Sequence, residues 1–287
     1  MYHEVQVPLS RNIVPTKGGR FRLIFLMPKG SQCHYSPGKT AFHNPFLKAR
    51  VKSQNLTGLI LLKWDISFIT MAKTVNVIGA TGLVGRELVR QLTGMPEIGR
   101  IKVFARRRTG FQHEKLEEYL VYFDKPDSWS HNLTGDVLFS TMGTTLKQAG
   151  SKAAQYRVDY TYQYETAASA AKNGVPVFIL VSSAGANEKS MVFYSRIKGK
   201  LDQDVRKLGF RKCAVLRPSI LAGEREKIRP AEKLANSVMQ VFSRFVFTRY
   251  RPIPANTVAA AMIRIALDDS SKGDITAELD EIFHLAQ

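Results

Sequence analysis

The sequence is poor in cysteine and lacks an ordered histidine pattern. Only Cys33 and Cys213 are cysteines among the 287 residues, which excludes a disulfide framework and a cysteine-based metal site. The six histidines show no spacing typical of metal ligands, so we predict no metal. Uninterrupted apolar runs are also scarce: the stretch from residue 56 to 71 is broken by Lys63 and Asp65, which argues against a membrane-spanning helix.

Acidic residues are few relative to basic ones. The formal net charge is +18, from 42 Lys and Arg against 24 Asp and Glu. Such a balance can indicate a nucleic-acid or acidic partner. No nucleic-acid-binding motif accompanies it, so we interpret the charge as a solvated basic surface and expect no nucleic-acid partner. A basic protein that binds nucleic acid or a membrane is an alternative that the charge alone supports.

The first seventy residues differ in composition from the rest. Residues 1–70 hold ten basic and only two acidic residues, with short apolar patches, and we predict an N-terminal extension without its own fold. We expect Met71 to be the natural start, because the first strand of the following fold begins directly after it. The alternative is an organellar transit peptide, which has a similar basic, acid-poor composition. We predict one domain over residues 71–287 and a cytoplasmic location, with organellar targeting as the alternative.

A glycine-rich turn organises that domain. The largely apolar, β-branched run Val75–Ile78 leads into a turn with Gly79, Gly82 and Gly85, after which the apolar spacing becomes helical. The N–H groups and the dipole at a helix start both favour an anion. Glycines at these positions permit the tight turn and the close approach of a pyrophosphate. The turn therefore predicts a dinucleotide site.

Three arginines follow the second predicted strand, Ile101–Ala105. Arg106 lies 21 residues after Gly85, where an acidic residue would bind the ribose hydroxyls of NAD. Arg106 and Arg107 would instead pair with a 2′-phosphate in charge-assisted hydrogen bonds. The sequence therefore predicts NADP(H) in preference to NAD(H).

Strands and helices alternate along the remaining chain. Further strands are predicted at Glu118–Phe123, Gly135–Thr141, Val175–Val181, Arg211–Leu216 and Glu281–Leu285. The pattern indicates an α/β fold of three layers, with a doubly wound parallel sheet between helices.

Residues 222–257 interrupt this alternation and predict a small C-terminal helical insertion on the substrate side. Within it, Ala231–Phe247 has the pattern of an amphipathic helix, and Asn256–Leu267 is predicted as a second helix. The first helix would cover the crevice or form a subunit interface, and contact with a membrane is the alternative.

A tyrosine and a lysine lie four residues apart after the fifth strand. Tyr194 and Lys198 would share one helix face. A nearby ammonium stabilises phenolate and lowers the pKa of a tyrosine. Tyr194 is therefore a candidate proton donor to a carbonyl, with Ser182 or Ser183 at the preceding strand end as its hydrogen-bond partner.

These motifs together resemble the short-chain dehydrogenases/reductases, which have a Rossmann fold. The motifs are Gly79-x-Thr81-Gly82-x-x-Gly85, Ser182-Ser183, Tyr194-x-x-x-Lys198 and Leu216-Arg217-Pro218. The sequence is more similar to the atypical branch related to nucleoside-diphosphate-sugar epimerases and NmrA-like proteins. Met142-Gly143-Thr144-Thr145, Val158-Asp159 and the run 182–186 resemble the HIV Tat-interacting protein group and its bacterial relatives. The resemblance covers about residues 73–286.

The resemblance implies a role for individual positions. Tyr194 would be the acid/base, Lys198 would lower its pKa, and Ser182 or Ser183 would orient the substrate oxygen. The implied cofactor-binding residues are Gly79, Thr81, Gly82, Leu83, Val84, Gly85, Arg106, Arg107, Thr141, Met142, Gly143, Lys198, Pro218 and Ser219. Two positions depart from the pattern. Asp159 stands where many active members of the family have an asparagine. Tyr122 stands near the position where relatives have an aspartate that binds adenine, a contact that Asp124 could make instead or that could be absent.

We therefore predict an NADP(H)-dependent oxidoreductase or epimerase-like enzyme, a monomer or homodimer acting on a small molecule. The alternative is a regulatory or redox-sensing protein that binds NADP(H) without turnover. The Tyr194–Lys198 pair favours the enzyme, and Asp159 favours the regulator.

Overall fold

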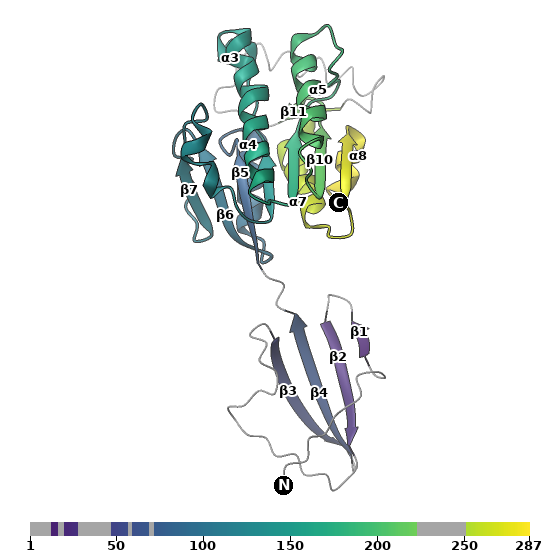
Figure 1. Cartoon of the computed structure of the whole chain (residues 1–287). Helices are drawn as coiled ribbons and strands as arrows, with labels where there is room; N and C mark the ends of the chain where they lie inside the picture. Colours follow the sequence, from purple (N-terminus) through teal and green to yellow (C-terminus); the bar gives the residue numbers. More distant parts are fainter. Residues whose placement is uncertain (1–12, 17–19, 28–46, 57–58, 69–71, 223–250) are drawn as a thin grey trace. The chain divides into compact units, whose positions relative to one another are not determined.

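The computed structural model describes residues 13–16, 20–27, 47–56, 59–68, 72–222 and 251–287 (Figure 1). The contacts divide the chain into two units, Met1–Met71 and Ala72–Gln287. The predicted helix Ala231–Phe247 lies outside the described residues. No helix in the described ranges is both long enough and apolar enough to cross a membrane.

The first unit contains an antiparallel sheet, which differs from our expectation of a segment without its own fold. Its strands are β1 (Ile13–Thr16), β2 (Arg20–Met27), β3 (Leu47–Leu56) and β4 (Leu59–Phe68), in the order β1-β2-β4-β3. The two central strands, β2 and β4, contain the short apolar patches of this segment. Short apolar, β-branched and aromatic runs form strands when a second such run pairs with them, and β2 pairs with β4 over its whole length.

The second unit is built on a seven-stranded sheet in which every pairing is parallel. Its order is β13-β10-β9-β8-β5-β6-β7. The strands are β5 (Lys73–Ile78), β6 (Ile98–Ala105), β7 (Leu116–Leu120), β8 (Val137–Ser140), β9 (Val177–Val181), β10 (Lys212–Arg217) and β13 (Gly273–Glu278). The chain winds outward from β5 in one direction through β6 and β7 and in the other through β8, so a crevice forms between β5 and β8. A separate short pair is formed by β11 (Leu221–Ala222) and β12 (Ile253–Pro254).

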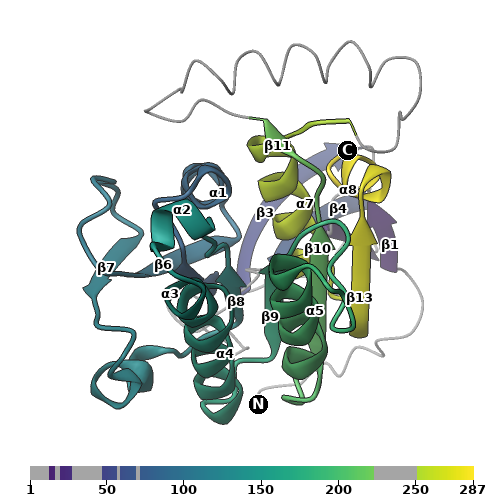
Figure 2. The same ribbon diagram turned by 90° about the horizontal axis from the view of Figure 1, so that it is seen from above.

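Helices cover both faces of the seven-stranded sheet (Figure 2). One layer contains α1 (Leu83–Thr93), α7 (Ala255–Leu267) and α8 (Asp280–Leu285). The other contains α4 (Tyr162–Lys172) and α5 (Phe193–Arg206), with a π-helical turn at Arg157–Thr161 before α4. The short helices α2 (Leu146–Ala149) and α3 (Lys152–Tyr156) and the 3₁₀ turns Pro126–Ser128 and Ser130–Asn132 complete the described elements of this unit. The predicted three-layer, doubly wound fold is confirmed.

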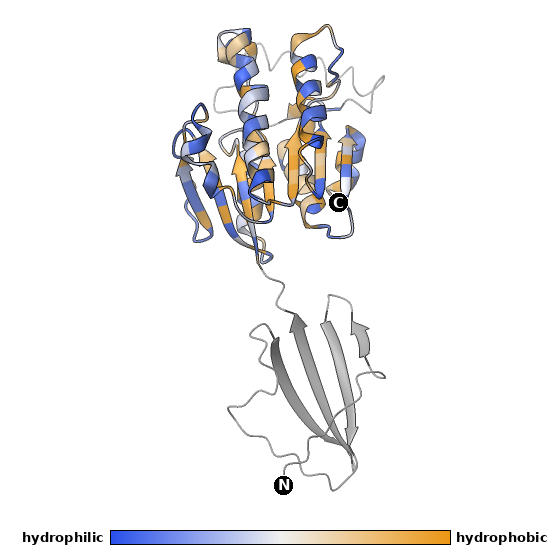
Figure 3. Cartoon of the chain, viewed as in Figure 1, coloured by the Kyte–Doolittle hydropathy of each residue, from blue (hydrophilic) through white to orange (hydrophobic). Residues whose placement is uncertain are grey.

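Side chains of the strands alternate between two cores because both faces of the sheet are covered. Val75 and Val77 pack in the core with α1 and α7, whereas Ile78 packs in the core with α4 and α5. Figure 3 shows that the central strands are the most apolar part of this unit. The predicted strand Glu281–Leu285 is wrong: this run lies in α8, and the edge strand is β13. A short apolar run does not by itself distinguish strand from helix.

Two of the basic residues, Lys212 and Lys102, are buried and hydrogen-bond to oxygens inside the protein. Lys212 is fully buried, and its Nζ donates to the carbonyl oxygen of Ile265 at 2.8 Å and to that of Asp268. These carbonyls lie at the C-terminal end of α7, where the helix dipole favours a cation. Lys102 similarly donates to the carbonyl oxygen of Asn132 at 3.1 Å and to Thr134 Oγ1 at 2.8 Å.

Replacing Lys212 by methionine should lower the free energy of unfolding by about 1–3 kcal/mol, because the two carbonyls would remain buried without their donor. Urea denaturation of the Lys212→Met and Lys272→Met variants measures this effect. Lys272 is exposed, so its variant controls for loss of a positive charge. Equal stability of the two variants would contradict a capping role for Lys212.

Candidate cofactor and catalytic site

The glycine turn after β5 is packed too closely for side chains. Gly79 has φ of +83°, and a Cβ atom there would lie 2.5 Å from the carbonyl carbon of Thr141. A Cβ atom at Gly85 would lie 2.1 Å from the Gly79 carbonyl oxygen. The Gly82 N–H donates to that same oxygen at 3.0 Å and closes the turn. The backbone packing at Gly79 and Gly85 therefore leaves no room for a side chain at either position.

The helix that follows the turn has the features of an anion site. Gly82 is the N-cap of α1 and offers no capping side chain, and the first turn contains no acidic residue. Thr81 and Gly82 are exposed, Leu83 is half-buried and Val84 is buried. Val84 therefore belongs to the core through its side chain, and only its backbone could meet a cofactor. N–H groups at such a helix start bind phosphate.

The predicted phosphate-binding arginines lie at the same edge of the sheet. Arg106 and Arg107 follow the last residue of β6 directly, and both are exposed. β6 is the parallel neighbour of β5, with Phe104 opposite Ile78. The carboxyl ends of these two strands therefore bring the arginines to the side of the glycine turn.

The end of β8 completes this part of the site from the other side. Thr141 donates to the Ile78 carbonyl oxygen twice, from its N–H at 3.0 Å and from Oγ1 at 2.9 Å. These bonds hold the backbone of Thr141 and Met142 against Gly79. Gly143, which follows, is exposed. The structure thus brings together the glycine turn and Thr141–Gly143, which the family resemblance implies to be cofactor-binding.

Tyr194 and Lys198 lie one turn apart on α5, and Lys198 is fully buried. Lys198 Nζ donates to the Val181 carbonyl oxygen at 3.2 Å. Burial lowers the pKa of Lys198, and the carboxylates of Asp159 and Asp202 oppose this effect. The two buried acids therefore partly compensate the desolvation of Lys198.

The pKa of Tyr194 departs from the expected direction. Burial raises it to about 12, the negative charge of Asp159 adds to the rise, and a hydrogen bond with Ser183 opposes it. Lys198 is not among the groups that shift this pKa, so the lowering expected from its ammonium stays a prediction. Desolvation disfavours the phenolate, and the negative charges of Asp159 and Asp202 add to this effect.

The two candidate serines occupy different surroundings after β9. Ser183 is the one that hydrogen-bonds Tyr194, and its Oγ also donates to the Ala184 carbonyl oxygen at 3.4 Å. Ser182 is buried, and its hydroxyl interacts with the Asp202 carboxylate and opposes the rise of that carboxyl's pKa. The next residues meet the end of β10, because the Ala184 N–H donates to the Pro218 carbonyl oxygen at 2.9 Å. Ser219 Oγ donates to the Arg251 carbonyl oxygen at 2.5 Å.

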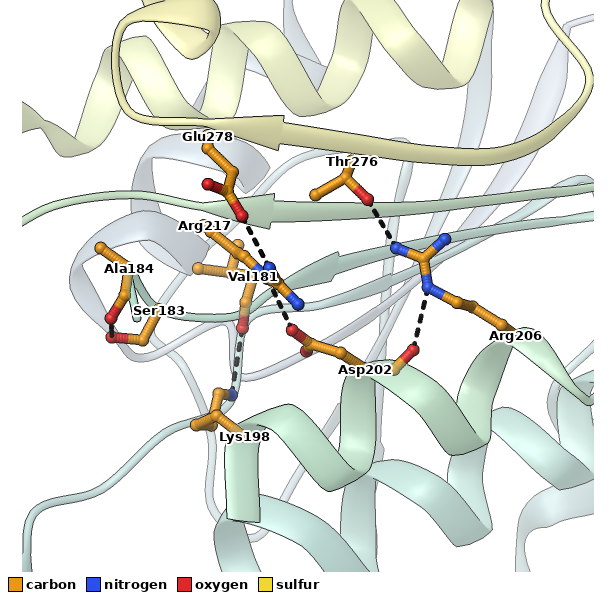
Figure 4. A network of polar contacts seen from close by, with 9 residues as sticks. All are labelled: Val181, Ser183, Ala184, Lys198, Asp202, Arg206, Arg217, Thr276 and Glu278. Atoms are coloured by element: carbon orange, nitrogen blue, oxygen red, sulfur yellow. Dashed lines mark hydrogen bonds and ion pairs between the residues drawn. The ribbon is translucent and has the colours of Figure 1, made fainter. Parts of the chain in front are cut away.

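Sequence reasoning missed a charged network that Asp202 of α5 forms with Arg217 and Glu278 (Figure 4). Asp202 is four residues after Lys198, and its fully buried carboxylate binds Arg217 Nε at 2.9 Å. Arg217 also binds Glu278 of β13 at 2.6 Å through Nη1. Arg217 was noted only as part of a Leu-Arg-Pro motif. The spacing of Tyr194, Lys198 and Asp202, each four residues apart, was the available signal.

Asp159 enters the site from the π-helical turn. Its carboxylate is fully buried and accepts the Thr144 N–H, with the nitrogen at 3.3 Å from Oδ1 and 3.4 Å from Oδ2. Burial raises its pKa to about 6, and the Lys198 ammonium opposes the rise. Asp124, in contrast, accepts a hydrogen bond from the Tyr162 hydroxyl at 2.8 Å, and Tyr122 is exposed.

The described residues also bear on metals and thiols. They contain no group of three or more His, Cys, Asp or Glu arranged to hold a metal ion. Cys213 is buried in the sheet, which raises the pKa of its thiol to about 12. A thiol in these surroundings is an inert core residue.

Sheet order, glycine turn and helix layers define a Rossmann protein with the fold of short-chain dehydrogenases/reductases and epimerases. Solved structures with this fold include the UDP-N-acetylglucosamine 4-epimerase of Methanobrevibacter ruminantium, at 15% identity and a TM-score of 0.56, over 74% of this chain and 80% of that one. The ADP-L-glycero-D-manno-heptose-6-epimerase of Helicobacter pylori has 16% identity and a TM-score of 0.56, over 73% and 77%. A short-chain dehydrogenase/reductase superfamily protein from Agrobacterium tumefaciens with bound NAD has a TM-score of 0.54, over 72% and 77%.

Sequence comparison gives the family within this fold. The chain is 34% identical to Protein FMP52, mitochondrial, of Candida albicans over 215 residues, which cover 71% of this chain and 90% of that protein. It is 33% identical to the protein of the same name in Debaryomyces hansenii, over 72% and 96% of the two chains. The chain belongs to the FMP52 family. No protein-family model matches it.

The names of these relatives correct one expectation. They include the word mitochondrial, which contradicts the cytoplasmic location that we predicted. The sequence signal for the alternative was present in the basic, acid-poor composition of residues 1–70.

Replacing Gly85 by alanine should lower the free energy of unfolding by about 1–3 kcal/mol, because the added methyl group overlaps the Gly79 carbonyl oxygen. Gly94→Ala at the other end of α1 is the matched control. Gly94 has φ of −81° and its nearest neighbour to a Cβ atom is 3.6 Å away, so its stability should change by less than about 1 kcal/mol. Urea denaturation compares the two, and equal effects would contradict the packing argument.

Proposed function

We propose that the protein is an NADP(H)-binding oxidoreductase of the short-chain dehydrogenase/reductase type. The observation that carries this proposal is the meeting of two groups of residues at one edge of the sheet. The glycine turn and Thr141 form a cradle at the start of α1. Tyr194, Lys198 and Ser183 lie together after the neighbouring strand β9. A cofactor in the cradle would extend toward the tyrosine along the carboxyl ends of the strands.

The cradle fits a dinucleotide because a Cβ atom would fill the space beside the turn. Gly79, Thr81, Gly82, Leu83, Val84 and Gly85 would hold the pyrophosphate. Arg106 and Arg107 would hold a 2′-phosphate, and Thr141, Met142 and Gly143 would border the adenosine ribose. Pro218 and Ser219 would border the nicotinamide. When bound, the nicotinamide supplies or accepts a hydride.

The protein's own residues would manage the proton and the substrate. The Tyr194 hydroxyl would exchange a proton with the carbonyl or hydroxyl oxygen of a small molecule. Ser183 would orient that oxygen, since its hydroxyl already reaches Tyr194. Ser182 is the less exposed candidate for orienting the substrate oxygen, because its Oγ is buried. Lys198 would bind the nicotinamide ribose and stabilise negative charge on Tyr194.

Two further functions are alternatives to this proposal. An epimerase-like reaction is supported by the fold shared with sugar-nucleotide epimerases, and the likeness to the Tat-interacting protein group rests on the Met142–Thr145 run. A regulatory or redox-sensing protein that binds NADP(H) without turnover is supported by the high pKa of Tyr194. We propose a mitochondrial location on the names of the FMP52 relatives, and a monomer or homodimer as the working unit.

Replacing Tyr194 by phenylalanine should reduce NADPH-dependent turnover of a carbonyl substrate by about 100- to 10,000-fold, because the proton donor is lost. NADPH binding should be retained. A panel of carbonyl compounds, followed by NADPH absorbance, measures turnover. Tyr164→Phe is the matched control. The Tyr164 ring stacks on the ring of Tyr160, with 5.7 Å between the ring centroids, and Tyr164 is not a residue of the candidate site. Unchanged turnover in Tyr194→Phe would show that Tyr194 is not the acid/base.

Replacing Arg106 by aspartate should weaken NADPH binding by about 10- to 150-fold, the equivalent of one charge-assisted contact of roughly 1.5–3 kcal/mol. NADH binding should change far less, because NADH has no 2′-phosphate. Fluorescence titration with both cofactors makes the comparison. Arg211→Asp, exposed at the amino end of β10, controls for the change in net charge. An equal loss of both cofactors would show that Arg106 does not read the phosphate.

A further inference from the structure

The loop that leaves the carboxyl end of β6 carries three consecutive arginines, Arg106, Arg107 and Arg108. All three are exposed. Within the part of the chain that the structure describes, none of these side chains forms an ion pair or a hydrogen bond. An anion can therefore bind their guanidinium groups without first displacing a carboxylate from them.

The backbone of this arginine loop is held at both ends. At its start, the carbonyl oxygen of Ala105, the last residue of β6, accepts the Val121 N–H at 2.9 Å. At its end, Glu118 Oε1 of β7 accepts the Thr109 N–H at 2.8 Å and also the Thr109 hydroxyl. Thr109 Oγ1 in turn accepts the Phe111 N–H at 3.3 Å. Only the three arginines lie between the two fixed residues, which limits the conformations open to them.

Glu118 holds the end of the loop on the face of the sheet that α1 covers. Side chains at alternate positions of a strand point to the same face. Leu116, two residues before Glu118, packs against the core that includes α1, and Phe111 packs against the same core. Tyr119, at the next position of β7, packs against the other core. The contact between Glu118 and Thr109 therefore keeps the arginine loop on the side of the sheet where α1 begins at the glycine turn.

We propose that Glu118 is a positioning residue for the choice of cofactor. By binding Thr109 it keeps the arginine loop in the conformation that receives the 2′-phosphate of NADP(H), and so favours this cofactor over NAD(H). The inference rests on the proposed NADP(H) site and adds a residue that does not itself touch the cofactor. A loop that is ordered before binding loses less conformational entropy when the cofactor binds.

The negative charge of Glu118 would by itself have the opposite effect. A carboxylate near a phosphate repels it, so removal of the charge alone should strengthen NADPH binding. Solvent and salt screen this charge, because Glu118 is only half-buried. The carboxylate also accepts two hydrogen bonds from Thr109. Loop ordering and charge repulsion therefore predict changes of opposite sign when the carboxylate is removed.

The test is fluorescence titration of the full chain with NADPH and with NADH. Glu118→Ala should weaken NADPH binding by about 5- to 30-fold, the cost of ordering the backbone of one residue, and NADH binding by less than about twofold. Glu118→Gln keeps an acceptor oxygen without the charge and should stay within about threefold of the wild type. Glu117→Ala removes the same charge from the same strand, but Glu117 binds Arg100 at 3.1 Å. This matched control should leave the ratio of the two affinities unchanged.

Amide hydrogen exchange without cofactor measures the order of the loop directly. Residues 106–111 should exchange faster in Glu118→Ala than in the wild type, but not in Glu118→Gln. Thr109→Val loses only the hydroxyl, and as a second variant it should weaken NADPH binding in the same direction by a smaller factor. An unchanged or stronger preference for NADPH in Glu118→Ala, an equal loss in Glu118→Gln, or unchanged exchange in Glu118→Ala would overturn the role of Glu118.

The two proposals fail in different ways. Wild-type protein that binds no NADPH, or that binds NADPH and NADH equally, would overturn the proposed cofactor. Wild-type protein that prefers NADPH, with the same preference in Glu118→Ala and Thr109→Val, would overturn the role of Glu118 alone.

Discussion

The close contact between the glycine turn and the end of β8 is the constraint on which the site depends. Gly79 can approach Thr141 only because it has no side chain, and Thr141 is held there by two bonds to the Ile78 carbonyl oxygen. Three residues later the same segment presents the Thr144 N–H to Asp159. Asp159 in turn acts on Lys198 and Tyr194. The contact therefore links the glycine turn to Tyr194 through one short stretch of chain.

Local sequence patterns were sufficient to locate the elements whose apolar residues recur with a clear helical or strand period, and the turn whose backbone requires glycine. The glycine turn, the buried strand β9 and the helix α7 lie where the sequence predicted them. The run Glu281–Leu285 was assigned to the wrong element because a short apolar segment satisfies both periods. The sheet of the first unit was missed because β1 and β2 join β3 and β4 only through the pairing of β2 with β4, which are distant in the sequence.

The sequence indicated which residues of the candidate site would lie together, but it did not indicate their electrostatics. The spacing of Tyr194 and Lys198 located the pair on one helix face, and the structure brings Ser183 to it. The direction of the Tyr194 pKa could not follow from that spacing. It depends on burial and on Asp159, which lies 35 residues earlier in the sequence and reaches the site only through the packing of α4 beside α5.

The buried charge of Asp159 also has a consequence for folding. A carboxyl whose pKa rises from 3.8 to about 6 on folding binds its proton more tightly in the native state than in the unfolded chain. Its contribution to stability is therefore complete below the unfolded pKa and is lost as the pH rises through 6. At neutral pH the folded protein retains an ionised group that opposes its own stability. Residues of this kind persist where activity, rather than stability, selects them.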